Sequence, residues 1–244
     1  MVNTFITQYP LPNAIKDLDY RRLGKQRVEA QQVLTAILSA HAIAREYCLP
    51  SCPTTSEFPG PEGDISREIW YTTVYDYYKT VVNKRKEYLY RDNNGIEFST
   101  TPTQTCCKRV GFGFVHHPIT YMWVGYEDGL RYYINLCILE WVDRGYKNTM
   151  TFYILHEMPE LPWWVQCPTF HHSQRSALLR KEKIRKELPW YWNLPHIVDG
   201  TANTVWYNTG YLWTNHLSLE NRLLLQEGKL LPELCAEIMN DFPE

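Results

Sequence analysis

The sequence predicts a mainly α-helical protein folded as one compact domain. Apolar residues recur every three to four positions over several long segments, which is the spacing of one helical face. These segments begin at residues that favour helix starts, such as Asp19 and Pro118, and end near Gly145 or Pro189. The length of 244 residues and the 44% share of hydrophobic residues allow one large core. We therefore expect a single domain over residues 1–244.

The first helix is expected to run from Asp19, its N-cap, to about Arg45. Apolar residues in this segment share one face, so the helix should be part of the core. The residues expected on that face are Leu23, Ala30, Val33, Leu34, Ile37 and Leu38.

Residues 50–112 are interpreted as an inserted segment. It opens with the helix-breaking run LPSCPTTSEFPGPEGD, after which Asp64 or Ser66 can cap a second helix. The segment RDNNGIEF then predicts a turn at the tip of a hairpin. The residues expected to point inward from the second helix are Ile69, Val74, Tyr77 and Val81.

The third helix has the longest apolar stripe. It is expected to begin at Pro118 and to continue without a break to Gly145. A fourth, basic helix, FHHSQRSALLRKEKIRKEL, is expected between Thr169 and Pro189. Short helices after Ser218 and Pro232 should form an extension over residues 216–244. This extension is acidic, because it contains six acidic and two basic residues.

Composition excludes several classes of protein. No apolar run reaches the roughly 18 to 20 residues of a membrane span, and the segment MVNTFITQYPLP lacks the features of a signal peptide. The seven cysteines show no spacing typical of a disulfide framework, which favours a reducing compartment. We expect an intracellular protein of the cytoplasm, the nucleus or a viral factory, with packaging in a virion left open. No obligate protein partner is evident.

Metal binding is not favoured by the sequence. The cysteines Cys48, Cys52, Cys106 and Cys107 could be imagined as a zinc site, but the adjacent pair cannot copy the geometry of a CxxC knuckle. Free thiols are the preferred interpretation, and no cofactor or metal is expected.

The segment YRRLGKQRVEAQQVL carries an unusual charge cluster at the start of the first helix. With about 100° of rotation per residue, Arg22, Gln26 and Glu29 flank the apolar face. Arg27 falls inside the apolar sector itself, so its charge needs a partner.

Two interpretations of this cluster remain open. The first is a set of helix-surface ion pairs, since Lys25 and Glu29 have the i, i+4 spacing of such a pair. The second is a ligand cleft in which the arginines hold phosphates and Glu29 lies near a reacting sugar. A net charge of -2 does not identify a nucleic-acid binder, although a basic face can exist within a neutral total.

A resemblance bears on this choice. The blocks DLDYRRLGKQRVEAQQVL, GFVHHPITYMWVGYEDGLRYYINLCILEWVDRGYKNTM and FHHSQRSALLRK, in this order, resemble the pyrimidine dimer DNA glycosylase family of the endonuclease V type. The similarity is to its larger, divergent branch in phages, bacteria and large DNA viruses. It covers about residues 1–38 and 111–213, and leaves the insertion and the acidic extension outside.

The resemblance implies a compact helical DNA repair enzyme with glycosylase and AP lyase activities. In this family the amine of the mature N-terminus attacks the sugar C1′ to form an imine, and a glutamate on the first helix assists β-elimination. Carried onto this chain, the glutamate is Glu29 and the amine is that of Val2, provided that Met1 is removed. Lys25 is the alternative nucleophile.

The resemblance also implies contacts with duplex DNA that contains damaged bases. On the first helix these fall on Arg22, Gln26 and Arg27. Other candidates are the helix-starting His117, the basic-helix residues His171, Ser173, Arg175, Arg180 and Lys181, and Trp206 and Tyr207 of the aromatic segment VWYNTGYLW. Capping for His117, core packing for the aromatic segment and simple solvation for the charges remain alternatives.

The main rivals to this function are a DNA-binding or virion-associated protein of the same fold without this chemistry, and a glycosylase for a different modified base. A DNA-binding protein would shift DNA without forming a covalent intermediate. The residue Val2 leaves room for both rivals, because the family's founding phage enzyme has threonine at the corresponding position.

Overall fold

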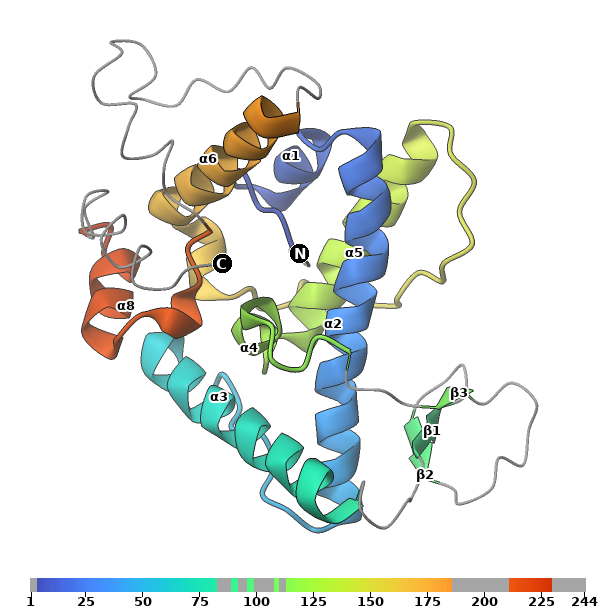
Figure 1. Ribbon diagram of the computed structural model, residues 1–244, viewed down its shortest axis with the longest axis vertical. Helices are drawn as coiled ribbons and strands as arrows, with labels where there is room; N and C mark the ends of the chain where they lie inside the picture. Colours follow the sequence, from blue (N-terminus) through green and yellow to red (C-terminus); the bar gives the residue numbers. More distant parts are fainter. Residues whose placement is uncertain are drawn as a thin grey trace. The chain divides into compact units, whose positions relative to one another are not determined.

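The computed structural model describes residues 4–82, 89–91, 96–98, 108–109, 113–185 and 211–229. Most of them are helical, so the mainly α-helical fold class is confirmed (Figure 1). Contacts divide the chain into two compact units. The first unit comprises Met1–Thr4 and Arg21–Pro162, and the second comprises Phe5–Tyr20 and Trp163–Glu244. A single domain therefore remains a prediction.

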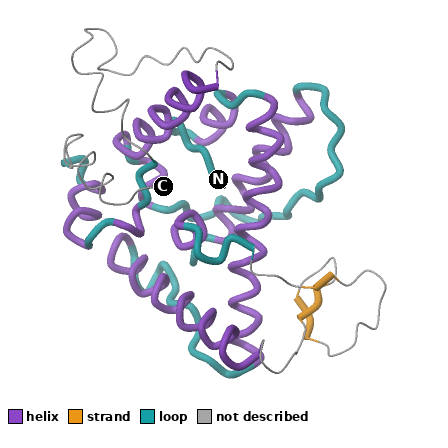
Figure 2. The backbone as a smooth tube through the Cα atoms, viewed as in Figure 1, coloured by secondary structure: helices purple, strands orange, loops and turns teal. Residues whose placement is uncertain are grey.

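The first unit is built mainly from four helices and a small sheet (Figure 2). The strands pair antiparallel in the order β2-β1-β3, and the β1–β2 hairpin confirms the expected hairpin in the insertion. The helical elements are α2 (Tyr20–Glu46), α3 (Gly60–Tyr77) with the π-helical turn η1 (Tyr78–Val82), α4 (Pro118–Trp123) and α5 (Glu127–Asp143). The strands are β1 (Leu89–Arg91), β2 (Ile96–Phe98) and β3 (Lys108–Arg109).

The helix α2 matches the expected first helix within a residue at its C-terminal end. Leu23, Ala30, Val33, Leu34 and Ile37 are fully buried, as the three-to-four spacing predicts. Leu38, the last residue expected on this face, is half-buried. Several alanines on the second half of α2 are also buried, which extends its core contact to the end of the helix.

The prediction of one long helix from Pro118 to Gly145 is wrong, because the chain breaks into α4 and α5. Gly125 adopts a φ of +85°, a left-handed conformation that favours glycine. The carboxylate of Glu127 accepts a hydrogen bond from the Gly125 amide at 3.0 Å, which satisfies a donor at the break. The expected ends are confirmed: α4 begins at Pro118, and α5 ends just before Gly145, whose φ is +83°.

The second helix also differs from its prediction. It begins at Gly60, with Pro59 as its N-cap, rather than after Asp64 or Ser66. Ile69 was expected to be buried but is 62% exposed. Val74 is buried as predicted, and Tyr77 and Val81 are half-buried. The buried face also carries two charged residues near the start of α3, which a search for apolar spacing alone does not find.

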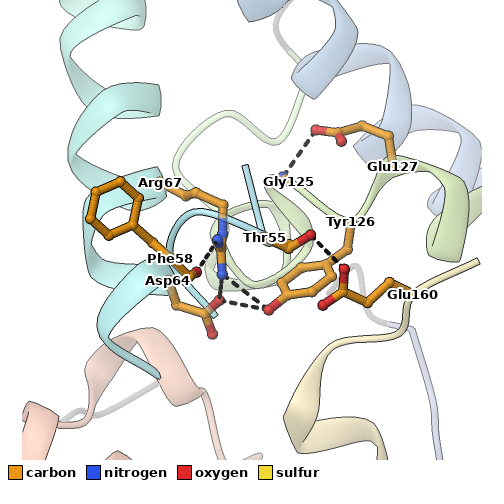
Figure 3. Close-up of polar contacts among 8 residues, drawn as sticks. All are labelled: Thr55, Phe58, Asp64, Arg67, Gly125, Tyr126, Glu127 and Glu160. Atoms are coloured by element: carbon orange, nitrogen blue, oxygen red, sulfur yellow. Dashed lines mark hydrogen bonds and ion pairs between the residues drawn. The ribbon is translucent and has the colours of Figure 1, made fainter. Parts of the chain in front are cut away.

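Those two residues form an ion pair inside the first unit (Figure 3). The guanidinium of Arg67 is fully buried and donates to the Asp64 carboxylate at 2.6 Å. It also donates to the Tyr126 hydroxyl at 3.0 Å and to the Phe58 carbonyl at 2.9 Å. The Tyr126 hydroxyl in turn donates to Asp64 at 3.2 Å. This buried cluster connects the loop before α3, α3 itself and the residue before α5.

Two glycines make room for this cluster. A Cβ on Gly63 would lie 1.8 Å from the Phe58 carbonyl oxygen, and a Cβ on Gly125 would lie 2.2 Å from Cδ of Arg67. Both distances are impossible for real side chains, so the backbone approaches Arg67 only because glycine occupies these positions.

The second unit contains α1 (Leu11–Lys16), the 3-10 turn η3 (Trp163–Gln166), α6 (Pro168–Arg185), the 3-10 turn η4 (Thr214–His216) and α8 (Leu219–Gln226). The sequence did not predict α1. The helix α6 confirms the expected basic helix and begins one residue before Thr169, while Pro189 lies outside the described residues. The helix expected after Ser218 is confirmed as α8, and the Ser218 hydroxyl caps it by accepting from the Asn221 amide. The expected helix after Pro232 lies outside the described residues.

Two further expectations concern membranes and metals. Among the helices that the structure describes, none combines the length and apolar character needed to cross a bilayer. In the same described part of the chain, no three His, Cys, Asp or Glu side chains gather as a metal site would require. Cys48 and Cys52 are free thiols, whereas Cys106 and Cys107 lie outside the described residues.

We predict that Asp64→Asn lowers the free energy of unfolding by about 3 kcal/mol or more, because it leaves the buried Arg67 cation without a counter-charge. Urea denaturation followed by circular dichroism measures this change.

Asp128→Asn is the matched control. Asp128 pairs with Arg131 at the same i, i+3 spacing and a similar distance of 2.5 Å, but its side chain is 66% exposed. This variant should lose about 1 kcal/mol or less. Equal losses for the two variants would contradict the role assigned to the buried pair.

Candidate active site

The helices α2 and α5 lie side by side in opposite directions. Near the start of α2, Gln26 bonds Tyr133, and farther along α2 His41 bonds Glu127 at the start of α5. The imidazole Nε2 of His41 lies 3.0 Å from the Glu127 carboxylate. Burial by itself would raise the pKa of the Glu127 carboxyl. The hydrogen bond and charge of His41, together with backbone donors, have a larger combined effect, so the pKa lies below its usual value. This pairing fixes one end of α5 against α2.

The Glu29 cluster, which consists of Gln26, Glu29 and Tyr133, lies between these helices. The side chain of Gln26 is fully buried, and its Nε2 donates to Glu29 Oε2 at 3.2 Å. The Tyr133 hydroxyl, also buried, donates to Gln26 Oε1 at 2.8 Å. Glu29 itself is half-buried. The expectation that Glu29 flanks the core face is therefore confirmed in geometry.

The N-terminal segment enters the same core. Thr4 is fully buried, and its hydroxyl accepts a hydrogen bond from the indole of Trp123 at 2.9 Å. The Trp123 ring lies against the ring of Tyr133, with centroids 6.2 Å apart. A continuous series of contacts thus joins Thr4 to the Glu29 cluster. Val2, the predicted nucleophile, lies outside the described residues.

Arg27 lies in the apolar sector of α2, as its helical position predicts. Its guanidinium carbon is 4.0 Å from the centre of the Trp141 ring, and its NH1 donates to Asn148 Oδ1 at 3.2 Å. The Trp141 ring also stacks on Tyr146. Burial lowers the pKa of Arg27. The partner that this cation requires is therefore an aromatic face and an amide, and a phosphate contact by Arg27 stays a prediction.

Arg22 and Lys25 continue the outer side of α2. Arg22 is half-buried and Lys25 is exposed. Both lie within one turn of Gln26, so the charged edge of α2 borders the Glu29 cluster. Their contacts with DNA, and the alternative role of Lys25 as nucleophile, remain untested.

A segment after α5 is tied to the same helices. The backbone of Tyr153 makes two hydrogen bonds of 2.8 Å with the Asn135 side chain on α5. The Tyr153 hydroxyl donates to Gln31 Oε1 on α2 at 2.5 Å. This tyrosine–glutamine pair resembles the one in the Glu29 cluster, but it lies on a different side of α2.

His117 serves as a cap. Its Nδ1 accepts a hydrogen bond from the Ile119 amide at 3.3 Å, at the start of α4. The capping interpretation is thus confirmed, and a contact with DNA stays a prediction.

In the second unit, three predicted site residues of α6 are engaged in packing. The His171 Nε2 lies 2.7 Å from the Val165 carbonyl, and the Ser173 hydroxyl donates to the Phe170 carbonyl. Both side chains are buried. Arg175 is half-buried and its Nε donates to the Thr7 carbonyl. This placement favours structural roles for His171 and Ser173, and their contacts with DNA remain untested.

The other predicted site residues cannot be placed. The helix α6 includes Arg180 and Lys181, but their side chains are not described. Trp206 and Tyr207 lie outside the described residues.

Sequence reasoning missed the roles of Tyr133, Trp141 and Asn148. Tyr133 and Trp141 fall within the apolar stripe expected between Pro118 and Gly145, and Asn148 had no expected role. A signal for each was present, since a glutamine at the border of an apolar face and an arginine inside it both require partners. The sequence alone could not say which residues supply them.

The structure thus defines a helical protein in which contacts through Trp123, Tyr133 and Gln26 link Thr4 to a half-buried glutamate on the charged edge of α2. The family model for pyrimidine dimer DNA glycosylase matches residues 2–154. Comparisons with curated proteins and with solved structures gave no match.

The chain therefore belongs to the pyrimidine dimer DNA glycosylase family. Membership implies a DNA repair enzyme of the glycosylase class with DNA as its substrate. The matched span runs through residues 50–112, which were expected to lie outside the family region. It ends before α6, so the predictions for α6 rest on the sequence block and its charge.

We predict that His171 makes stability depend on pH. Burial lowers its pKa from 6.5 to about 4, so the unfolded state binds the proton first as the pH falls. The contribution is complete above the unfolded pKa. The free energy of unfolding should therefore decrease by about 3 kcal/mol as the pH falls from the unfolded pKa of 6.5 to the folded pKa of about 4.

His171→Gln should remove this part of the pH dependence in urea titrations. His156→Gln, which replaces an exposed histidine, should leave it unchanged. An unaltered pH profile in His171→Gln would contradict the assignment.

Proposed function

We propose that the protein is a DNA glycosylase with β-lyase activity that acts on cyclobutane pyrimidine dimers in duplex DNA. The series of contacts from Thr4 through Trp123, Tyr133 and Gln26 to Glu29 supports this proposal most directly. It links Thr4, the first described residue of the chain, to Glu29 within the first unit, and the proposed chemistry needs an N-terminal amine and a glutamate close together.

The proposed nucleophile is the α-amine of a mature N-terminus at Val2, which precedes Thr4 by two residues in the sequence. Thr4 is fixed by its buried hydrogen bond with Trp123. An α-amine has a pKa near 8, so a useful fraction is neutral at pH 7.

The proposed reaction has two stages. The neutral amine attacks C1′ of the damaged nucleotide, the bond from C1′ to the base breaks, and the base leaves with the bonding pair and takes up a proton. Loss of the amine proton and opening of the C1′–O4′ bond give the imine. A base then removes a proton from C2′, and the released pair expels the 3′ phosphate as the C3′–O bond breaks. Water hydrolyses the imine and restores the amine.

Glu29 is the proposed acid–base group for these proton transfers. It is half-buried, lies on the outer border of the core, and accepts a hydrogen bond from Gln26. Lys25 on the preceding turn is the alternative source of the amine.

Cationic side chains are proposed to hold the DNA backbone. On α2 these are Arg22 and Arg27, and on α6 they are Arg175, Arg180 and Lys181. Phosphate contacts of this kind release counterions and position the duplex without reading its sequence. Trp206 and Tyr207 are proposed to contact an unstacked base.

We predict that Glu29→Gln lowers the rate of strand incision at a dimer by about 100-fold or more, because it removes the acid–base group. Binding to the same duplex should change little, since the two side chains have the same shape. Single-turnover incision assays and binding measurements on a duplex with one dimer test both statements.

Glu46→Gln is the control, because Glu46 is an exposed residue at the end of the same helix. It should cleave as the unaltered protein does. Normal incision by Glu29→Gln would remove Glu29 from the mechanism.

A further inference from the structure

The Glu29 cluster contains an amide in an unusual position. Gln26 is fully buried on α2, although a glutamine side chain is normally exposed. Both ends of its amide make hydrogen bonds, to Tyr133 on one side and Glu29 on the other. A buried amide retained beside a half-buried carboxylate has a stability cost that a leucine would avoid.

The direction of these hydrogen bonds fixes the orientation of the amide. The Tyr133 hydroxyl donates to Oε1, so Nε2 must point towards Glu29. In the reverse orientation Oε1 would face the carboxylate oxygen, which is repulsive unless Glu29 is protonated. The observed arrangement therefore favours the ionised carboxylate and holds one of its oxygens in place.

Tyr133 is itself held firmly. It is fully buried and packs against Trp123, the residue that bonds Thr4. Its hydroxyl is therefore a fixed donor, and a change there should reach Glu29 through Gln26.

We propose that Tyr133 and Gln26 are positioning residues that keep the Glu29 carboxylate ionised and oriented for the proton transfer from C2′. The assignment rests on the proposed function of Glu29. It changes the expected role of Gln26, because a fully buried side chain is not placed to contact DNA in this structure.

The test compares two tyrosines. Tyr133→Phe removes the hydroxyl that orients Gln26, whereas Tyr153→Phe removes the hydroxyl that bonds Gln31 on the same helix. Both variants delete one tyrosine–glutamine hydrogen bond between α2 and the rest of the first unit. The first of these glutamines, Gln26, contacts Glu29.

Kinetics on a duplex with one dimer give the first readout. Tyr133→Phe should lower kcat about tenfold with little change in KM, as expected when an interaction acts mainly in the transition state. The acidic limb of its pH–rate profile should move to higher pH. Without the Tyr133 hydroxyl, the Gln26 amide is no longer held towards Glu29, so the ionised carboxylate is less stabilised and its pKa rises. Tyr153→Phe should change neither. Gln26→Leu should reproduce the effect of Tyr133→Phe, and the double variant should be no worse than Gln26→Leu alone.

Nuclear magnetic resonance gives a second readout that needs no activity. In the unaltered protein, the side-chain amide protons of Gln26 should shift as the Glu29 carboxyl titrates, and this shift should be absent in Glu29→Gln. If the amide does not respond, the proposal is wrong even if the variants fail to fold.

The two proposals fail in different ways. Equal kcat values for Tyr133→Phe and Tyr153→Phe, with normal incision by the unaltered protein, would overturn the positioning role and leave the proposed function intact. Absence of incision by the unaltered protein, with a responsive Gln26 amide, would overturn the function while the hydrogen-bonded orientation of Glu29 stands.

Discussion

The buried cation of Arg67 is the constraint on which the first unit depends. A charge removed from water must be compensated by well-placed partners, and here they come from the loop before α3, from α3 and from the residue before α5. Gly63 and Gly125 are required because the backbone packs directly on this cluster. The break between α4 and α5 follows from the same requirement, since the left-handed residue at the break is the one that makes room for the arginine.

The position of α5 then determines the candidate active site. With Tyr126 and Glu127 held at its start, α5 passes α2 in the opposite direction and presents Tyr133 to Gln26 and Trp141 to Arg27. The polar groups in this interface find different partners. Arg27 stacks on Trp141, whereas Gln26 bonds both Tyr133 and the Glu29 carboxylate at the border of the core.

Much of the helical framework could be predicted from spacing and caps. The face of α2, the cap and proline that start α4, and the cap of α8 are local features that a sequence contains. The break at Gly125 and the buried charges of α3 could not be predicted, because both depend on Arg67, a charged residue that pattern reasoning assigns to the surface. For the candidate site, the position of Glu29 at the edge of the core face and the need of Arg27 for a partner were predictable. Tyr133 was not, since its hydroxyl has meaning only once α5 is placed against α2.

The central claim is that the N-terminal amine and Glu29 carry out imine chemistry on damaged DNA. Borohydride trapping during incubation with ultraviolet-irradiated and abasic-site duplexes, followed by peptide mapping of the adduct, tests it most directly. The account predicts a covalent adduct on the N-terminal peptide with both duplexes. Intact binding to both duplexes without any adduct would contradict it, and would indicate a member of the family that holds DNA without this chemistry.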